Sequence, residues 1–277
     1  MSRSSTSILA AKATPARPKR RRKSQASRLL VDNAYRLLIV AAILAGWQIS
    51  VQAGWVNAFL LGSPVGIWTE FKRLVLSGQL LTNTLTTLYS TLAGFITGCL
   101  LGSLAGLALW YSARLARVID PFMVALNGLP KIALAPMIII WFGSGLFSKV
   151  ALAFIATFVV SLLSAYQGTH QIDNSLVNLM RSLGASRGQT FRKLVVPSTL
   201  PWIISGLRLN IGFALVAVIG GEFISSDAGL GRMIFVAGNL FNLNEVWVGV
   251  LTLLAMAMLL YFVVTKLQEK MLPWANR

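Results

Sequence analysis

The chain has 277 residues, of which 56% are hydrophobic and only 12% are charged, and its mean hydropathy is +0.70. This composition excludes an ordinary soluble domain and indicates an integral membrane protein with several apolar runs close to the roughly 20 residues that a bilayer-crossing helix needs. The net charge of +17 does not indicate a nucleic-acid-binding protein, because ten of the 25 basic residues precede residue 37: Arg3, Lys12, Arg17, Lys19, Arg20, Arg21, Arg22, Lys23, Arg28 and Arg36.

The first 34 residues are rich in Ser, Ala, Lys and Arg. Such a segment cannot bury a core, so we expect it to be disordered. Its basic run at 19–23 favours a cytoplasmic location and contact with anionic lipid. We therefore assign residues 1–34 to a basic cytoplasmic tail and residues 35–277 to one transmembrane domain.

The first apolar run, residues 37–51, predicts a short membrane helix. A basic region, an apolar stretch and small residues two apart are also typical of a cleaved signal peptide. The sequence leaves both alternatives open, and N-terminal sequencing of the mature protein would distinguish them.

Residues 65–78 predict a surface helix in the outer membrane interface, with Ile67, Phe71 and Leu74 on one face. A second span follows at about 85–110. It carries a glycine at every fourth position, which makes a smooth stripe where another membrane helix can approach closely. These glycines are Gly94, Gly98, Gly102 and Gly106.

Four further spans are predicted at about residues 119–141, 149–166, 201–221 and 246–264, with an external loop or re-entrant segment at 222–244. If the N-terminus lies inside, six crossings place most basic loop residues inside, in agreement with the positive-inside rule. Both termini are then cytoplasmic.

A polar segment, residues 173–200, separates the fourth and fifth spans. Leucines and a methionine at helical spacing predict a short amphipathic helix, and Gly184 predicts a sharp turn after it. Ser186 and Gln189 have the spacing of a capping box that begins a second short helix, which we expect to end by Pro197. Two such helices around a glycine form a compact knob with basic edges, suited to docking a soluble partner.

This segment resembles the cytoplasmic coupling loop of ABC importer permeases, whose pattern is Glu-Ala-Ala, three residues, Gly, nine residues, then Ile-x-Leu-Pro. Gly184 and the stretch ending at Pro197 match its second half, whereas Asn178, Leu179 and Met180 replace Glu-Ala-Ala. That departure puts in doubt any contact made through the glutamate. Other stretches, PKIALAPMIIIWFGSG, GLRLNIGFALVAVIGGEF and GLGRMI, resemble the nitrate, sulfonate and taurine branch of these permeases, and the resemblance covers roughly residues 35–270.

The resemblance implies an all-α integral membrane fold with about six transmembrane helices, of the type I ABC importer permease kind. It implies a permease subunit that moves a small anionic solute such as nitrate, a sulfonate or taurine across the bacterial inner membrane. A thiamine-precursor pyrimidine or another small organic solute is the alternative substrate. The implied partners are a second copy of the permease subunit in a homodimer, two cytoplasmic ATPase subunits that bind ATP and Mg²⁺, a periplasmic or surface solute-binding protein, and membrane lipid.

The resemblance also assigns site residues. For coupling to the ATPase they are Leu179, Met180, Arg181, Leu183, Gly184, Arg187, Phe191, Arg192 and Pro197. The candidates for the substrate pathway are polar residues within spans, where burial in lipid is costly. These are Asn127, Lys131, Arg208, Asn210 and Glu222. The structural alternatives are that Arg208 extends to the cytoplasmic interface and that Lys131 pairs with Asp120 or Glu222.

Catalytic and cofactor motifs were not found. The sequence contains no Gly-x-x-x-x-Gly-Lys-Ser/Thr phosphate loop, so we expect ATP hydrolysis in a partner and no cofactor in this chain. A single histidine, His170, and no Gly-x-Ser-x-Gly elbow argue against a metal site or an integral-membrane enzyme. The main alternative function is a membrane channel or scaffold that is not coupled to ATP.

Overall fold

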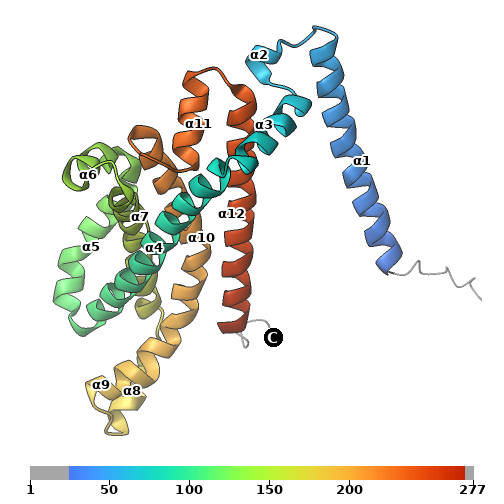
Figure 1. Cartoon of the computed structure of the whole chain (residues 1–277). Helices are drawn as coiled ribbons and strands as arrows, with labels where there is room; N and C mark the ends of the chain where they lie inside the picture. The colour runs from blue at the N-terminus through green and yellow to red at the C-terminus, as the bar shows by residue number, and fades with distance from the viewer. Residues whose placement is uncertain (1–24, 272–277) are drawn as a thin grey trace, which may run out of the picture. The chain divides into compact units, whose positions relative to one another are not determined.

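The computed structural model describes residues 25–271, with side-chain placements from residue 32 onward. Every regular element in this range is a helix (Figure 1). Five of the described helices are long and apolar enough to cross a membrane, and a bent pair of helices forms a sixth candidate. The expected all-helical membrane fold with about six spans is therefore confirmed.

The chain divides into two compact units between residues 49 and 50. The first unit holds most of helix α1 (Gln25–Gln52), which contains the first predicted apolar run. Helix α1 begins inside the segment that we assigned to the tail, so residues 25–34 are helical. Residues 1–24 lie outside the described residues, and for them disorder and lipid contact stay predictions.

Two short helices open the second unit. Helix α2 (Ala58–Leu61) is followed by α3 (Pro64–Leu76), which begins with a proline at its first position and with Ser63 as its N-cap. Leu74 is fully buried in the core, as the predicted apolar face requires.

Helix α3 is fastened to α12 (Leu243–Met271) by polar contacts. The Arg73 guanidinium donates to Glu70 Oε1 at 2.6 Å and to Glu245 Oε2 at 3.0 Å. The hydrogen bond from Arg73 holds the pKa of Glu70 below its usual value. The surface helix is therefore a fixed part of the bundle.

The predicted glycine stripe lies on α4 (Gln79–Ala108), which continues into a 3₁₀ turn, η1 (Leu109–Tyr111). All four glycines face α7 (Leu146–His170) so closely that a Cβ on any of them would overlap α7 atoms. The Thr157 hydroxyl donates across this contact to the carbonyl oxygen of Gly94 at 3.2 Å. The stripe predicted from spacing is thus a helix-packing surface, the role that small residues have in membranes.

Replacing Gly98 with alanine is expected to lower the free energy of unfolding by about 1–3 kcal/mol, since overpacking a tight contact has that cost. The added carbon would overlap the Thr157 hydroxyl and lie 2.7 Å from the backbone oxygen of Phe154. Thermal unfolding of the detergent-purified protein measures the effect. Gly212→Ala on helix α10 (Val196–Ile224) is the matched control, because nothing lies within 4 Å of its added carbon. Equal melting temperatures for the two variants would contradict the prediction.

The third predicted span is not one continuous helix. Helix α5 (Ala113–Gly128) is followed by the 3₁₀ turn η2 (Lys131–Leu134) and α6 (Ala135–Phe142), and the two halves meet at an angle of 89°. Leu129 has extended backbone angles, φ −72° and ψ 130°. A residue that precedes a proline is disfavoured in the helical region, so Pro130 accounts for the break.

The prediction that the second short helix ends by Pro197 is wrong, and so is the start of the fifth span at Pro201. Helix α9 (Arg187–Thr190), a π-helical stretch η3 (Phe191–Val195) and α10 (Val196–Ile224) follow one another without a break. The N–H of Val196 reaches back five residues to the Phe191 carbonyl. This wider turn accommodates Pro197, which has no N–H and would crowd the preceding turn of a regular α-helix.

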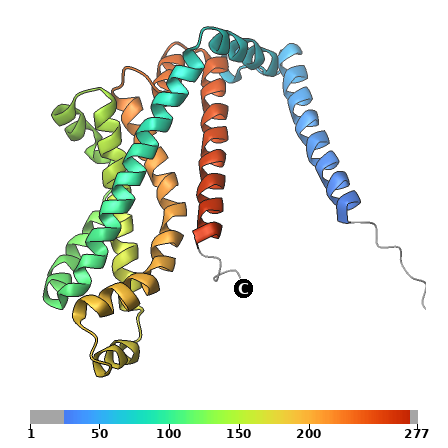
Figure 2. The same ribbon diagram turned by 60° about the horizontal axis from the view of Figure 1, so that its bottom comes forward.

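Within the second unit, α8 (Asn174–Ser182) and α9 lie at one end, which we call the knob end, with the C-terminus of α12 toward the same side (Figures 1 and 2). Helices α3, α6 and α11 (Leu230–Asn239) lie toward the other, the far end. The far-end helix α11 falls in the predicted loop or re-entrant segment 222–244. Basic residues remain more numerous toward the knob end among the described residues. They are Arg114, Arg117, Arg181, Arg187, Arg192, Lys193, Arg208, Lys266 and Lys270, against Lys72, Arg73, Lys131, Lys149 and Arg232 toward the far end.

Candidate functional site

The knob, residues 173–195, begins with a well-capped helix. The Asp173 carboxylate accepts a hydrogen bond from the backbone N–H of Ser175 at 2.8 Å and caps α8. This bond stabilises the ionised form, so the pKa of Asp173 lies below its ordinary value. The first predicted helix of the knob is present.

Gly184 forms the turn between the two helices of the knob. Its φ is +75°, in the left-handed region that glycine adopts without strain. The N–H of Gly184 donates to the Arg181 carbonyl and the N–H of Ala185 to the Met180 carbonyl, both at 2.9 Å. These two bonds are the Schellman arrangement that satisfies the last carbonyls of a helix.

The predicted capping box then begins α9. The Ser186 hydroxyl accepts from the N–H of Gln189 at 3.3 Å, and the Gln189 side chain accepts from the N–H of Ser186 at 2.8 Å. Reciprocal capping of this kind fixes the direction in which the chain leaves the turn. The orientation of α9 relative to the Gly184 turn is therefore defined locally.

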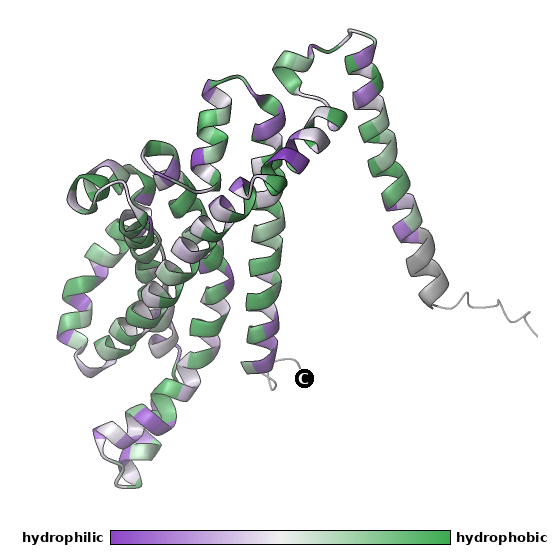
Figure 3. Cartoon of the chain, viewed as in Figure 1, coloured by the Kyte–Doolittle hydropathy of each residue, from purple (hydrophilic) through white to green (hydrophobic). Residues whose placement is uncertain are grey.

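Three leucines of the knob are exposed, which is costly unless they meet a partner. The exposed fraction is 54% for Leu179, 73% for Leu183 and 44% for Leu176. They stand among exposed arginines on an otherwise polar segment (Figure 3). We call Leu176, Leu179 and Leu183 the leucine patch; exposed apolar patches rimmed by polar residues mark interaction surfaces.

Two predicted coupling residues instead contact their own chain. Arg187 donates to the Tyr111 carbonyl and lies over the rings of Trp110 and Tyr111, each 5.6 Å from the ring centroid. The Phe191 ring lies 4.8 Å from the Tyr111 ring. The knob is therefore held against the end of the α4 span as well as being continuous with α10.

The other predicted coupling residues differ in exposure. Arg181 and Arg192 are exposed and Met180 is half-buried. Pro197 lies inside the continuous helix described above rather than at a helix end.

The predicted pathway residues Asn127 and Lys131 lie together beside the bend between α5 and η2. The Lys131 ammonium donates to the Asn127 carbonyl at 2.6 Å. This hydrogen bond gives one N–H of the ammonium an acceptor in the backbone four residues earlier. Lys131 is therefore held by its own turn rather than by Asp120 or Glu222.

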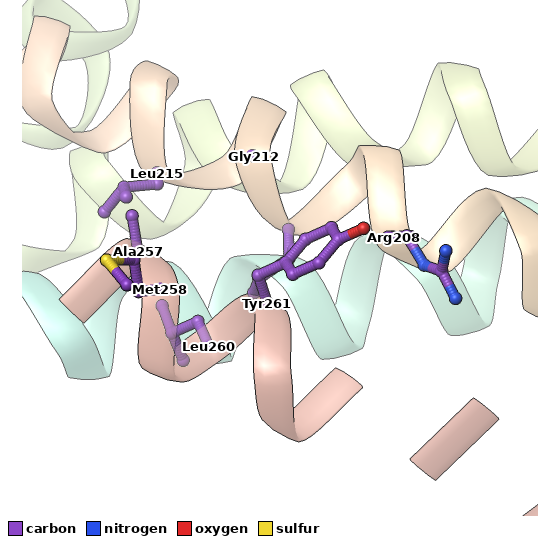
Figure 4. Close-up of a pocket in the computed structure, with 8 residues that line it drawn as sticks. Arg208, Gly212, Leu215, Ala257, Met258, Leu260 and Tyr261 are labelled. Atoms are coloured by element: carbon purple, nitrogen blue, oxygen red, sulfur yellow. The ribbon is translucent and has the colours of Figure 1, made fainter. Parts of the chain in front are cut away.

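Arg208 lies in a separate place, beside an apolar groove of about 310 Å³ between α10 and α12. Its guanidinium donates to Gln268 at 2.8 Å and lies over the ring of Tyr261. Figure 4 shows Arg208 and Tyr261 toward one end of the groove and Leu215 toward the other. Because Gln268 is in the last turn of α12, this position favours the alternative in which Arg208 extends to the membrane boundary.

Asn210 and Glu222 are buried in helix contacts. The Asn210 amide donates to the Ser161 hydroxyl at 2.8 Å and joins α10 to α7. The Glu222 carboxylate accepts from the Thr87 hydroxyl at 2.8 Å and from the N–H of Gly231 at 2.7 Å. Glu222 thus ties α10 to α4 and to the first turn of α11, where a carboxylate also stabilises the helix dipole.

The five predicted pathway residues therefore do not converge on one cavity of the chain. Sequence reasoning also missed Lys149, which is 1% exposed and lines a far-end cavity of about 160 Å³. The place of Lys149 at the start of a long apolar run is the signal that could have found it, because a cation next to a span is a candidate for an intramembrane role. Among the described residues, no group of three or more His, Cys, Asp or Glu side chains could hold a metal ion.

Comparisons with known proteins agree with this architecture. Residues 98–276 match the family model described as "Binding-protein-dependent transport system inner membrane component". The chain is 32% identical to the putative aliphatic sulfonates transport permease protein SsuC of Bacillus subtilis over 87% of both chains. It is 31% identical to the taurine transport system permease protein TauC of Escherichia coli over 68% of this chain and 71% of that one. A chain of the MetNI methionine ABC transporter, in an inward-facing conformation, has the same fold, with a TM-score of 0.62 and 18% identity over 70% of this chain and 97% of that chain.

Proposed function

Since the chain belongs to the binding-protein-dependent transport system inner membrane component family, it is the membrane-spanning permease subunit of an ATP-driven ABC importer, and we propose that it carries a small anionic solute. Transport subunits of this family are not enzymes, and a separate ATPase supplies the energy. The names of the relatives SsuC and TauC favour a sulfonate or taurine, with nitrate in the same chemical class. A thiamine-precursor pyrimidine or another small organic solute is the alternative.

We propose that two copies of the chain form the pathway, with two ATPase subunits on the cytoplasmic side and a solute-binding protein on the outer side. ATP and Mg²⁺ are bound by the ATPase subunits. The excess of basic residues toward the knob end supports a cytoplasmic knob and cytoplasmic termini. The far end then faces the solute-binding protein, and lipid surrounds the bundle.

The observation that carries the coupling proposal is the connection of the knob to two spans. The exposed leucine patch offers an apolar surface to the ATPase, and Arg181 and Arg192 offer charges to acidic partner residues. Movement of the patch is passed through the Gly184 turn to α9, from there along the unbroken helix to α10, and to α4 through the contacts of Arg187 and Phe191. Such rigid-body motion reorients a bundle without unfolding it.

The absence of the Glu-Ala-Ala motif changes which side chains can contact the ATPase. Asn178 and Leu179 occupy positions where the family pattern has a glutamate and an alanine. We propose that apolar contacts of the leucine patch carry more of the docking energy in this protein than in permeases that retain the glutamate.

Substituting Leu179 and Leu183 with serine is expected to abolish co-purification of the ATPase, since each buried leucine contributes about 1.5–3 kcal/mol. The measurement is affinity purification of the tagged chain after co-expression, with the retained subunit identified by its phosphate-loop sequence. The matched control is the pair Leu76→Ser and Leu240→Ser, which are 87% and 74% exposed and lie away from the knob.

Full retention by the knob variant would contradict docking at the leucine patch. Recovery of no phosphate-loop subunit with the unsubstituted chain would instead favour the channel or scaffold alternative.

A further inference from the structure

The far-end cavity lies between α4, the α6–α7 loop and the α10–α11 loop, apart from the knob. None of the residues that we assigned to the pathway lines it, although Glu222 is near enough to Lys149 to interact with it electrostatically. Six polar residues line it: Thr86, Ser90, Ser144, Lys149, Ser226 and Asp227. We propose that it binds a small zwitterion, with the acid group at Lys149 and the amine group at Asp227. This inference rests on the proposed importer function, because it makes the cavity a solute site on the side where the binding protein delivers its cargo.

The cavity contains one strong donor. Lys149 is 1% exposed, and its ammonium donates to the Ser144 carbonyl. An ammonium has three N–H donors, and this carbonyl is its one hydrogen-bond acceptor among the residues that the structure describes. Two donors are therefore left for the oxygens of a ligand.

The start of α7 adds positive potential at the same place. Gly145 and Leu146 line the cavity, and Gly145 is an N-cap without a side-chain hydrogen bond to the helix. The free N–H groups and the dipole of a 25-residue helix favour negative charge there. An acid group of the ligand beside Lys149 would be stabilised both by the ammonium and by the N-terminus of α7.

Apart from the Ser144 hydroxyl, the remaining polar side chains of the cavity act as acceptors. The hydroxyls of Thr86, Ser90 and Ser226 already donate to backbone carbonyls, at 2.9, 2.9 and 2.7 Å, so their oxygens are left with lone pairs. Asp227 is exposed and carries a carboxylate that can only accept. The Asp227 carboxylate would repel a simple anion. Within the proposed class of acidic solutes the cavity therefore favours one that also carries an ammonium group, which would donate to these oxygens.

The two charges of the cavity attract each other without closing into an ion pair. Asp227 and the buried Glu222 both interact electrostatically with Lys149, yet within the described part of the chain the salt bridges shorter than 4.0 Å are made by Arg73 and Lys266. A zwitterion can therefore lie between the two charges, with its acid group at the Lys149 ammonium and its amine group at the Asp227 carboxylate.

The volume of the cavity indicates the size of the ligand group that it can hold. A volume of about 160 Å³ corresponds to roughly five water molecules at about 30 Å³ each. This space suits an acid group and a primary amine joined by two or three carbons. Taurine has this form, whereas ethanesulfonate and nitrate lack the amine.

The test is equilibrium binding of labelled taurine and labelled ethanesulfonate to the full-length permease, purified with its ATPase in lipid nanodiscs. The unsubstituted protein is expected to bind taurine at least about tenfold more tightly than ethanesulfonate, because the ammonium adds charge-assisted hydrogen bonds. Asp227→Asn is expected to weaken taurine binding about tenfold and to leave ethanesulfonate binding unchanged or tighter. Lys149→Met is expected to weaken both, with Lys72→Met, an exposed lysine toward the same end, as its control.

Equal affinity for the two probes, or no binding of either at millimolar concentration, would overturn the inference. So would an Asp227→Asn variant that loses both probes alike, since this exposed substitution would then act on something other than the amine. Retention of the ATPase by each variant is recorded in the same preparation. A failure of the zwitterion site thus leaves the importer function standing, and a failure to retain the ATPase leaves the binding result intact.

Discussion

Replacing Gly184 with valine is expected to abolish ATP-driven uptake while leaving membrane insertion intact. Gly184 has φ +75°, and nothing lies within 4 Å of an added Cβ, so the substitution acts through the backbone alone. The left-handed region costs an L-residue roughly 1–2 kcal/mol, and a β-branched residue is a true outlier there. The turn would therefore open, and the leucine patch would lose its fixed position relative to α9.

The measurement is solute uptake and ATPase activity of the complete importer in proteoliposomes. Gly184→Asn is the control, because asparagine is the side chain that best tolerates this conformation. It should retain most of the uptake. Loss of uptake in both variants, or in neither, would show that the conformation of the turn is not what matters.

Replacing Glu222 with alanine is expected to destabilise the far end by about 2–6 kcal/mol. The carboxylate accepts from the Thr87 hydroxyl and from the N–H of Gly231, and it is 1% exposed. Its removal would leave two buried donors without an acceptor, at about 1–3 kcal/mol each. Thermal unfolding in detergent measures the loss, and protease sensitivity of α11 locates it.

Glu222→Gln keeps an oxygen at this position and is expected to recover most of the stability. That result would separate hydrogen bonding from charge. If the alanine variant melted at the same temperature as the unsubstituted protein, Glu222 would not be the anchor of α11, and a transport role would become the better explanation for its burial.

The features that could be predicted from the sequence are those that depend on local spacing. The glycines at every fourth position gave the α4 packing surface, and the spacing of Ser186 and Gln189 gave the capping box. The apolar face of residues 65–78 gave the surface helix with Leu74 buried. Each of these rests on contacts within a few residues or on one face of one helix.

The features that could not be predicted depend on contacts between distant segments. Arg187 and Phe191 are residue types that are common on docking surfaces, but in the structure they contact Trp110 and Tyr111 of the same chain. Lys149 and Asp227 line one cavity only because two loops meet there. The helix breaks before Pro130 but continues through Pro197, although both prolines have apolar surroundings. The difference is that the helix before Pro197 contains a π-turn, which has one more residue than an α-turn.

The π-helical stretch of residues 191–195 joins α9 to α10 and sets the rotation of α9 about the axis of the continuous helix. A regular α-helix turns by about 100° per residue, given 3.6 residues per turn, and a π-turn introduces one residue beyond that count. A single insertion or deletion in this stretch would therefore rotate α9, and with it the docking surface that we propose, by about 100° relative to the membrane spans.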